Sequence, residues 1–169
     1  MTDTKVIGKV SPMSTTIGDV AADVGKGLFA GLSGTAAMTV SSTLEMKLSG
    51  RGASQSQTPA EAAEAVLDVE PEDEGSEAQF SNLVHWGYGT GWGAVRGLLA
   101  SAGLSGPVAT AAHLGLVWGS EQAVLPALGV SAPVFKYGGK AVATDLLHHT
   151  VYATATGLAY TYLDRSQTR

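Results

Sequence analysis

The sequence contains no cysteine, so neither a disulfide bond nor a thiolate metal site can form in this chain. An excess of basic residues is also missing: 10 Lys and Arg stand against 15 Asp and Glu, and the net charge is −5. That balance does not favour a nucleic-acid partner. Nucleotide-binding loops, nucleophile elbows, HExxH zinc motifs and paired-carboxylate hydrolase signatures are absent as well. We therefore expect no enzymatic activity and no cofactor.

Charge is almost missing from four stretches that make up most of the chain. Each stretch contains at most one Asp, Glu, Lys or Arg. A bilayer core of about 30 Å requires about 20 helical residues, and a helix of a water-surrounded domain would carry a polar face. The sequence therefore predicts an all-α, polytopic membrane protein, a four-helix transmembrane bundle with the lipid bilayer as its partner. The four predicted spans are 27–44, 80–102, 107–128 and 141–163.

The remaining segments predict how the chain is divided. We expect a polar tail and interfacial entry over 1–26, a transmembrane domain over 27–163 and a short tail over 164–169. The segment 45–79 is predicted to be an acidic extramembrane loop containing a helix that begins near Thr58. Its acidic run is interpreted as a solvated connector, with cation capture as the alternative.

Glycine recurs at four-residue spacing in three of the four stretches. Such small-xxx-small patterns allow two helix backbones to approach closely. The contact could lie within one chain or between copies in a homo-oligomer, and the sequence leaves both open. The glycines predicted to mediate packing are Gly27, Gly31, Gly89, Gly93, Gly97, Gly115 and Gly119.

A small set of ionisable residues lies inside the uncharged stretches. Asp145 and His148 or His149 are three or four residues apart, so they share one helix face. Counting residues from the ends of the stretches places Glu121 and His85 at a similar depth. Arg96 is expected to reach either Glu121 or His113. The predicted polar cluster is His85, Arg96, Glu121, Asp145, His148 and His149.

Three interpretations of this cluster remain open. Buried polar groups can tie helices together through hydrogen bonds. Carboxylates and histidines can also form a proton or cation path, because histidine titrates near neutral pH. Histidine and carboxylate ligands suit zinc or iron, so a metal or haem site is the third interpretation. His148 and His149 point about 100° apart on a helix and are not expected to bind one ion together.

Four sequence motifs carry a resemblance to a known family. They are GLFAGLSGTAAMT, HWGYGTGWGAVRGLL, VWGSEQAVLPALG and DLLHHTVYATATGLAY. Over about residues 20–163 the chain resembles a family of small, uncharacterised bacterial integral membrane proteins, mostly actinobacterial, that is loosely grouped with the YagU-like inner membrane proteins. The resemblance implies a multi-pass protein of the bacterial inner membrane and assigns no reaction to any residue.

Together these patterns predict a non-enzymatic structural or accessory membrane component with a buried polar cluster. The alternative is a small proton- or cation-conducting membrane protein, and a metal- or haem-binding membrane protein is the third possibility. A second copy of the chain or another membrane protein is the expected partner, and nucleic acid is not.

Overall fold

The computed structural model describes residues 16–50, 58–69, 71 and 73–167, and the regular secondary structure of this part of the chain is all helix. It contains four long helices, one short helix and a single 3-10 turn. Their bounds are α1 Ile17–Ser49, α2 Thr58–Leu67, α3 Glu74–Ser101, α4 Gly106–Ala127, η1 Val134–Lys136 and α5 Gly139–Gln167.

The prediction of a transmembrane bundle is wrong. Among the helices that the structure describes, none combines the length and the apolar character needed to cross a bilayer. The error lies in equating uncharged with hydrophobic. Gly, Ala, Ser and Thr fill much of 27–44, and such small or hydroxyl side chains gain far less from lipid than Leu, Ile or Phe do. The four predicted spans and the predicted multi-pass location in the bacterial inner membrane are therefore both corrected.

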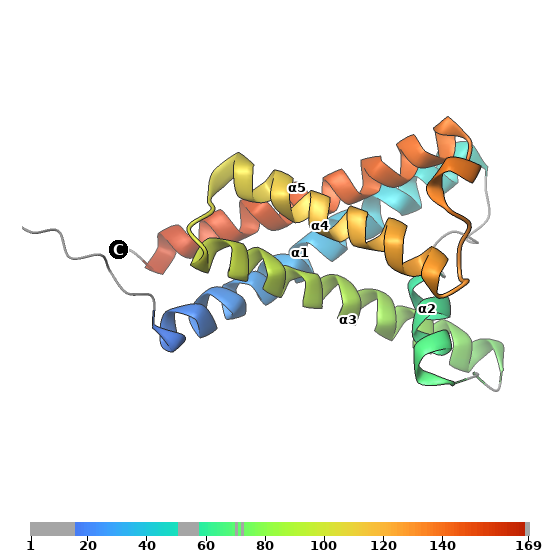
Figure 1. Cartoon of the computed structure of the whole chain (residues 1–169), viewed down its shortest axis with the longest axis horizontal. Helices are drawn as coiled ribbons and strands as arrows, with labels where there is room; N and C mark the ends of the chain where they lie inside the picture. Colours follow the sequence, from blue (N-terminus) through green and yellow to red (C-terminus); the bar gives the residue numbers. More distant parts are fainter. Residues whose placement is uncertain (1–15, 51–57, 70, 72, 168–169) are drawn as a thin grey trace, which may run out of the picture.

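The long helices lie roughly along one direction and form an elongated bundle (Figure 1). α1 packs along both α3 and α5, while α4 covers α5 and the short α2 lies against the first part of α3. At one end of the bundle, α1 and α4 begin and α3 and α5 finish. The opposite end gathers α2, η1, the start of α3 and the start of α5.

Local sequence signals define where the long helices begin and end. Thr16 and Asp19 form a reciprocal capping box at the start of α1, and Gly50 ends that helix with φ of 67°. Asp73 caps α3 by accepting a hydrogen bond from the Ser76 backbone N–H at 2.8 Å. Between α3 and α4, Gly103 has φ of 87°, a left-handed conformation that favours glycine.

Backbone-to-backbone contact joins α1 to α3. A Cβ added at Gly93 would lie 2.7 Å from Cα of Gly31, and one added at Gly31 would lie 2.8 Å from the Thr90 carbonyl oxygen. Gly27 faces the backbone of Gly93 and Gly97 in the same way. We call this contact, formed by Gly27, Gly31, Gly93 and Gly97, the glycine seam. Only glycine allows this approach, because any side chain would force the two helices apart.

The predicted packing glycines do not all behave alike. Gly89 lies against Thr35 across the same pair of helices, where an added Cβ would meet the Thr35 side chain. By contrast, a Cβ at Gly115 or Gly119 of α4 would meet nothing within 4 Å. Gly34, which the spacing pattern did not single out, packs on Tyr152 of α5. Close packing therefore centres on α1 and not on α4.

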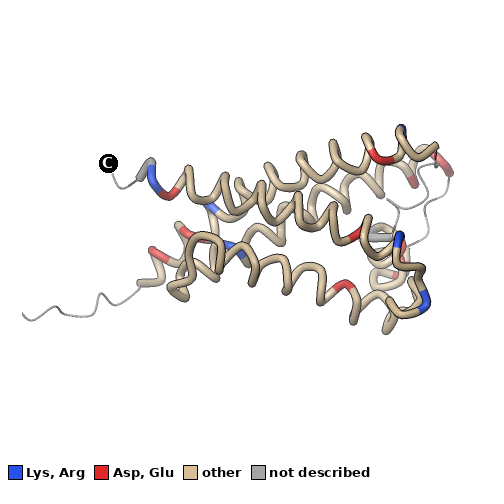
Figure 2. The backbone as a smooth tube through the Cα atoms, turned by 90° about the horizontal axis from the view of Figure 1, so that it is seen from above, with Lys and Arg blue, Asp and Glu red and all other residues tan. Residues whose placement is uncertain are grey.

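Charged residues gather towards the two ends of the bundle, whereas most of the middle is uncharged (Figure 2). The middle is held by a small core of Val117, Tyr152 and Ala153. Met38 and Trp92 pack against this core from α1 and α3. The uncharged middle of the bundle thus lies between two charged ends, and each end contains a cavity.

Candidate functional site

The larger cavity lies at the end of the bundle where α5 begins, and has a volume of about 970 Å³. Side chains from α1, α2, α3, α4 and α5 form its wall, so five helices position one site. Most of the lining is apolar or aromatic. Its carboxylates are Glu45, Glu121 and Asp145, and none of the described lining residues is Lys or Arg. We call it the acidic cavity.

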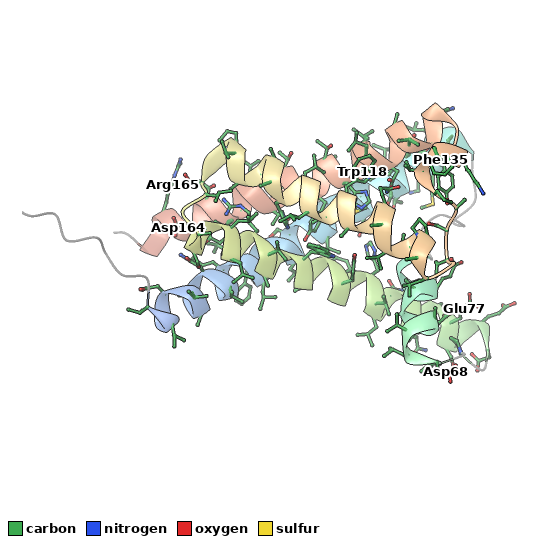
Figure 3. The ribbon with its side chains drawn as sticks, in the orientation of Figure 1. Asp68, Glu77, Trp118, Phe135, Asp164 and Arg165 are labelled. Carbon is green, nitrogen blue, oxygen red and sulfur yellow. The ribbon has the colours of Figure 1, made fainter. Side chains whose placement is uncertain are left out.

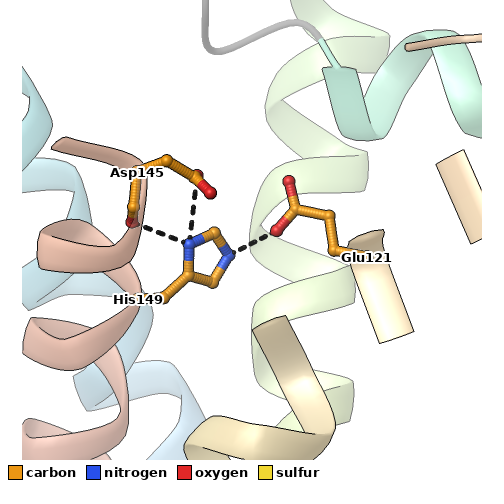
Figure 4. A group of neighbouring side chains, drawn as sticks. All are labelled: Glu121, Asp145 and His149. Atoms are coloured by element: carbon orange, nitrogen blue, oxygen red, sulfur yellow. Dashed lines mark hydrogen bonds and ion pairs between the residues drawn. The ribbon is translucent and has the colours of Figure 1, made fainter. Parts of the chain in front are cut away.

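His149 lies between two carboxylates in the wall of this cavity (Figure 4). Its Nε2 is 2.8 Å from Oε2 of Glu121 on α4. Its Nδ1 is 3.2 Å from Oδ1 of Asp145 and 3.0 Å from the Asp145 backbone oxygen, one helical turn earlier on α5. Trp118 donates its indole N–H to Oδ2 of Asp145 at 2.7 Å. Both edges of the imidazole therefore face oxygen acceptors.

This arrangement keeps His149 protonated. Burial by itself lowers the pKa of His149, but hydrogen bonds and charge from Asp145 and Glu121 outweigh it and raise that pKa to about 10. Burial likewise raises the pKa of Asp145, but the bonds from His149 and Trp118 hold it below its usual range. At neutral pH the three groups are two carboxylates and one imidazolium, which leaves a negative charge in the wall.

The other predicted histidines also line the acidic cavity. His148 shares a hydrogen bond of 2.9 Å with the Ser41 hydroxyl of α1 through Nδ1. His85 meets the Thr39 hydroxyl at 2.9 Å through Nε2, and burial lowers the pKa of His85, so it is neutral at pH 7. These two residues therefore anchor the polar wall to α1.

Glu121, Asp145 and His149 could each offer one ligand atom to a metal ion, since those atoms lie within 4.8 Å of one another. Two features oppose a single ion held by all three. The carboxylates face opposite edges of the imidazole ring (Figure 4). Moreover, a metal-binding imidazole nitrogen must be unprotonated, whereas the two carboxylates raise the pKa of His149 and keep its imidazole protonated.

Arg96 lies away from this cluster, at the other end of the bundle. Its guanidinium stacks on the Tyr160 ring, with Cζ 4.3 Å from the ring centroid. Asp145 and Tyr160 are 15 residues apart on α5, or about 22 Å along the helix. The expected pairing of Arg96 with Glu121 is therefore not formed. His113, the other expected neighbour, is fully buried, and its Nε2 is 3.0 Å from the Trp92 carbonyl oxygen.

Several residues of the site were not anticipated from the sequence. Trp118 could have been found from its spacing, because it precedes Glu121 by three residues and so shares its helix face. Tyr152, by contrast, is expected from its spacing to share a helix face with Asp145, His148 and His149, and it donates to the Gly89 carbonyl oxygen at 2.6 Å. Ser41 and Thr39 carry no such signal, since hydroxyls are common throughout α1.

The comparisons with protein-family models, with curated proteins and with solved structures find no match to this chain. The resemblance to the uncharacterised bacterial family stays a prediction, as do the non-enzymatic role and the homo-oligomer.

Proposed function

We propose that the protein is a non-enzymatic binding protein whose acidic cavity takes a small organic cation with an apolar body. One observation carries the proposal: a large, mostly apolar cavity has several carboxylates in its wall and no described Lys or Arg. Cavities of 300–1,000 Å³ with apolar walls and a few convergent polar groups are typical of small-molecule sites.

The charge of the wall selects the sign of the ligand. His149 offsets one of the three carboxylates Glu45, Glu121 and Asp145, so the wall stays negative. The second oxygen of Glu121 points away from the imidazole in Figure 4 and is placed to accept from a ligand. A cation gains from this field in a partly desolvated site, whereas an anion is repelled.

Aromatic side chains give the cavity a second way to favour a cation. Tyr88, Trp92, Tyr137 and Tyr152 all line it. The faces of aromatic rings attract ammonium groups, and aromatic cages for quaternary ammonium use this property. Apolar residues from α2, α3 and α4, among them Val66, are available to cover a hydrocarbon chain.

Octyltrimethylammonium, used below its micelle-forming concentration, tests the proposal by titration calorimetry against octyl sulfate and octanol. We expect the ammonium to bind at least about tenfold more tightly than octyl sulfate, because each 1.4 kcal/mol of charge preference is tenfold in Kd. Each further methylene in the chain should tighten binding about fourfold, which corresponds to about 0.8 kcal/mol per buried CH₂.

A matched pair of variants locates the binding site. Glu121→Gln should weaken ammonium binding about tenfold and leave octanol binding unchanged. Glu61→Gln removes an equal charge from an exposed position outside the cavity and should change neither. Equal affinity for ammonium and sulfate, or an equal loss in both variants, would overturn the proposal.

A divalent metal ion is a second candidate because the possible ligand atoms of Glu121, Asp145 and His149 lie within 4.8 Å of one another, but it requires the imidazole to leave its position between the two carboxylates. Binding would have to displace the His149 proton, because the imidazole nitrogen and the carboxylates are all protonation-sensitive ligands. Zinc titrations in two buffers of different ionisation enthalpy measure that proton. Release of about one proton per zinc, lost in His149→Gln, would support this candidate, and zinc binding without proton release would remove it.

A further inference from the structure

The charged guanidinium of Arg96 is buried, but not all of its N–H groups have a hydrogen-bond acceptor among the described residues. The residue is only 2% exposed. Its Nε and Nη1 are buried without a hydrogen-bond partner among the described residues. Burying a charged group without partners is costly, and arginine does not readily lose its proton. The guanidinium therefore needs an acceptor that the described part of the chain does not supply.

A second cavity, of about 430 Å³, lies beside this guanidinium. Arg96 and Tyr160 line it from α3 and α5, and the turn from Gly103 to Gly106 closes one side. Figure 3 shows Asp164 and Arg165, which also line this cavity, at the end of the bundle away from Trp118. We call it the Arg96 cavity.

The two acids of the Arg96 cavity already have other partners. Asp23 accepts from Lys26 at 2.7 Å, from the Ser101 hydroxyl at 2.9 Å and from the Tyr160 hydroxyl at 2.9 Å. Asp164 pairs with Lys26 at 2.6 Å. The described lining of the cavity thus holds two acids and two arginines, so its formal charges balance. Neither acid accepts a hydrogen bond from Nε or Nη1 of Arg96, which leaves these two donors for a ligand.

The start of α4 adds backbone donors at the same place. Ser105 precedes this 22-residue helix but makes no side-chain capping bond, and Ser105 and Gly106 both line the cavity. The first N–H groups of a helix have no partners within the helix and carry a partial positive charge. An oxyanion at this position would meet both a guanidinium and a helix N-terminus, the usual components of a phosphate or carboxylate site.

We propose that the Arg96 cavity binds a small oxyanion, held by the Arg96 guanidinium and the backbone N–H of Gly106 at the start of α4, since the next residue, Pro107, has no N–H. This site is separate from the acidic cavity and does not depend on the function proposed for it. The ligand chemistry is a compact carboxylate or phosphate group, because the cavity offers two buried guanidinium N–H donors that have no acceptor among the described residues.

Thermal unfolding of the full chain with inorganic phosphate, at an ionic strength held constant with sodium chloride, tests the inference. We expect the Tm to rise by about 4 °C at a phosphate concentration of about ten times Kd. Acetate in place of phosphate separates carboxylate from phosphate recognition, and a specific rise with either supports the site. No rise with either, compared with chloride, would overturn it.

Three variants distinguish a site from general charge screening. Arg96→Lys keeps the charge but loses the planar donor array, and should weaken oxyanion binding at least about tenfold. Ala100→Leu fills the cavity wall and leaves every charge in place, so it should abolish the rise even if the Arg96 variant folds poorly. Lys140→Gln removes an exposed charge outside the cavity and should retain the rise in full.

A rise that persists in Ala100→Leu, or one that disappears in Lys140→Gln, would contradict the assignment. The first result would place the oxyanion elsewhere, and the second would show that only overall charge matters.

Discussion

The two ends of the bundle treat a buried cation in opposite ways. At the acidic cavity, the His149 imidazolium has a carboxylate at each edge, from Glu121 and Asp145. At the Arg96 cavity, the guanidinium has an aromatic face from Tyr160 but leaves two nitrogens without an acceptor among the described residues. The chain therefore buries its two cations in different ways: one lies between carboxylates, and the other stacks on an aromatic ring with two nitrogens left unbonded within the described part of the chain.

The two buried cations also differ in their expected roles, since one contributes to folding stability and the other is available to bind a ligand. A cation that the chain itself compensates contributes to holding its helices together, and removing it leaves uncompensated charge behind. A cation that the chain leaves short of partners contributes little to folding and is available to a ligand. His149 belongs to the first kind, and Arg96 belongs to the second.

Breaking the glycine seam should have the largest effect, because it joins α1 to α3 by direct backbone contact. Gly93→Ala would place a Cβ 2.7 Å from Cα of Gly31, and we expect a loss of at least about 3 kcal/mol of unfolding free energy. Gly115→Ala is the matched control, since its Cβ meets nothing within 4 Å, and it should gain up to about 1 kcal/mol. Urea unfolding measures both. Equal effects would show that the helices are not in backbone contact.

Removing the compensated cation should have the next largest effect. His149→Gln leaves Glu121 and Asp145 without the imidazolium between them, and we expect a loss on the order of 3 kcal/mol at pH 7. The pKa of His149 is raised in the folded state, so its contribution is complete below about pH 6.5 and is lost as pH rises to about 10. Urea unfolding of the wild type between these values should show that decline.

Two variants test whether His149 causes the fall in unfolding free energy with pH. His149→Gln should flatten the decline, while His85→Gln should leave it unchanged, because burial lowers the pKa of His85 and places its titration below this window. A wild-type stability that does not fall between pH 6.5 and 10 would mean that His149 is not held protonated.

Removing the uncompensated cation should have the smallest effect. Arg96→Met keeps much of the side-chain volume, and we expect the unfolding free energy to change by about 1 kcal/mol or less in chloride buffer. Replacing a poorly paired buried charge with an apolar group is often neutral, because the desolvation cost disappears with the charge. A loss comparable to that of His149→Gln would show that the chain compensates Arg96 after all.

Helical spacing was enough to anticipate part of the candidate site. Asp145 and His149 are four residues apart on one helix, and depth counting brought Glu121 to their level from another. The surroundings of Arg96 were not predictable in this way. Asp23 and Tyr160 lie on helices far away in the chain, and only the packing of α1 and α5 brings them together.

The fold, like the site, was predictable from the sequence only in part. The long helices follow from capping residues and glycine turns that the sequence displays, such as the turn at Gly103. The lack of charged residues in these helices, however, does not show that lipid surrounds them. The stretch 27–44 is rich in small side chains that suit close helix contact, and this same property leaves it short of the apolar character that a span requires.

The glycine seam has a mechanical consequence. Where two backbones touch directly, no layer of side chains is available to change rotamer and absorb a displacement. α1 and α3 should therefore move together where the seam joins them, over about 6 Å of helix from Gly27 to Gly31. A ligand that pushes on either helix there is expected to shift both, because moving one alone would require the two helix backbones to separate.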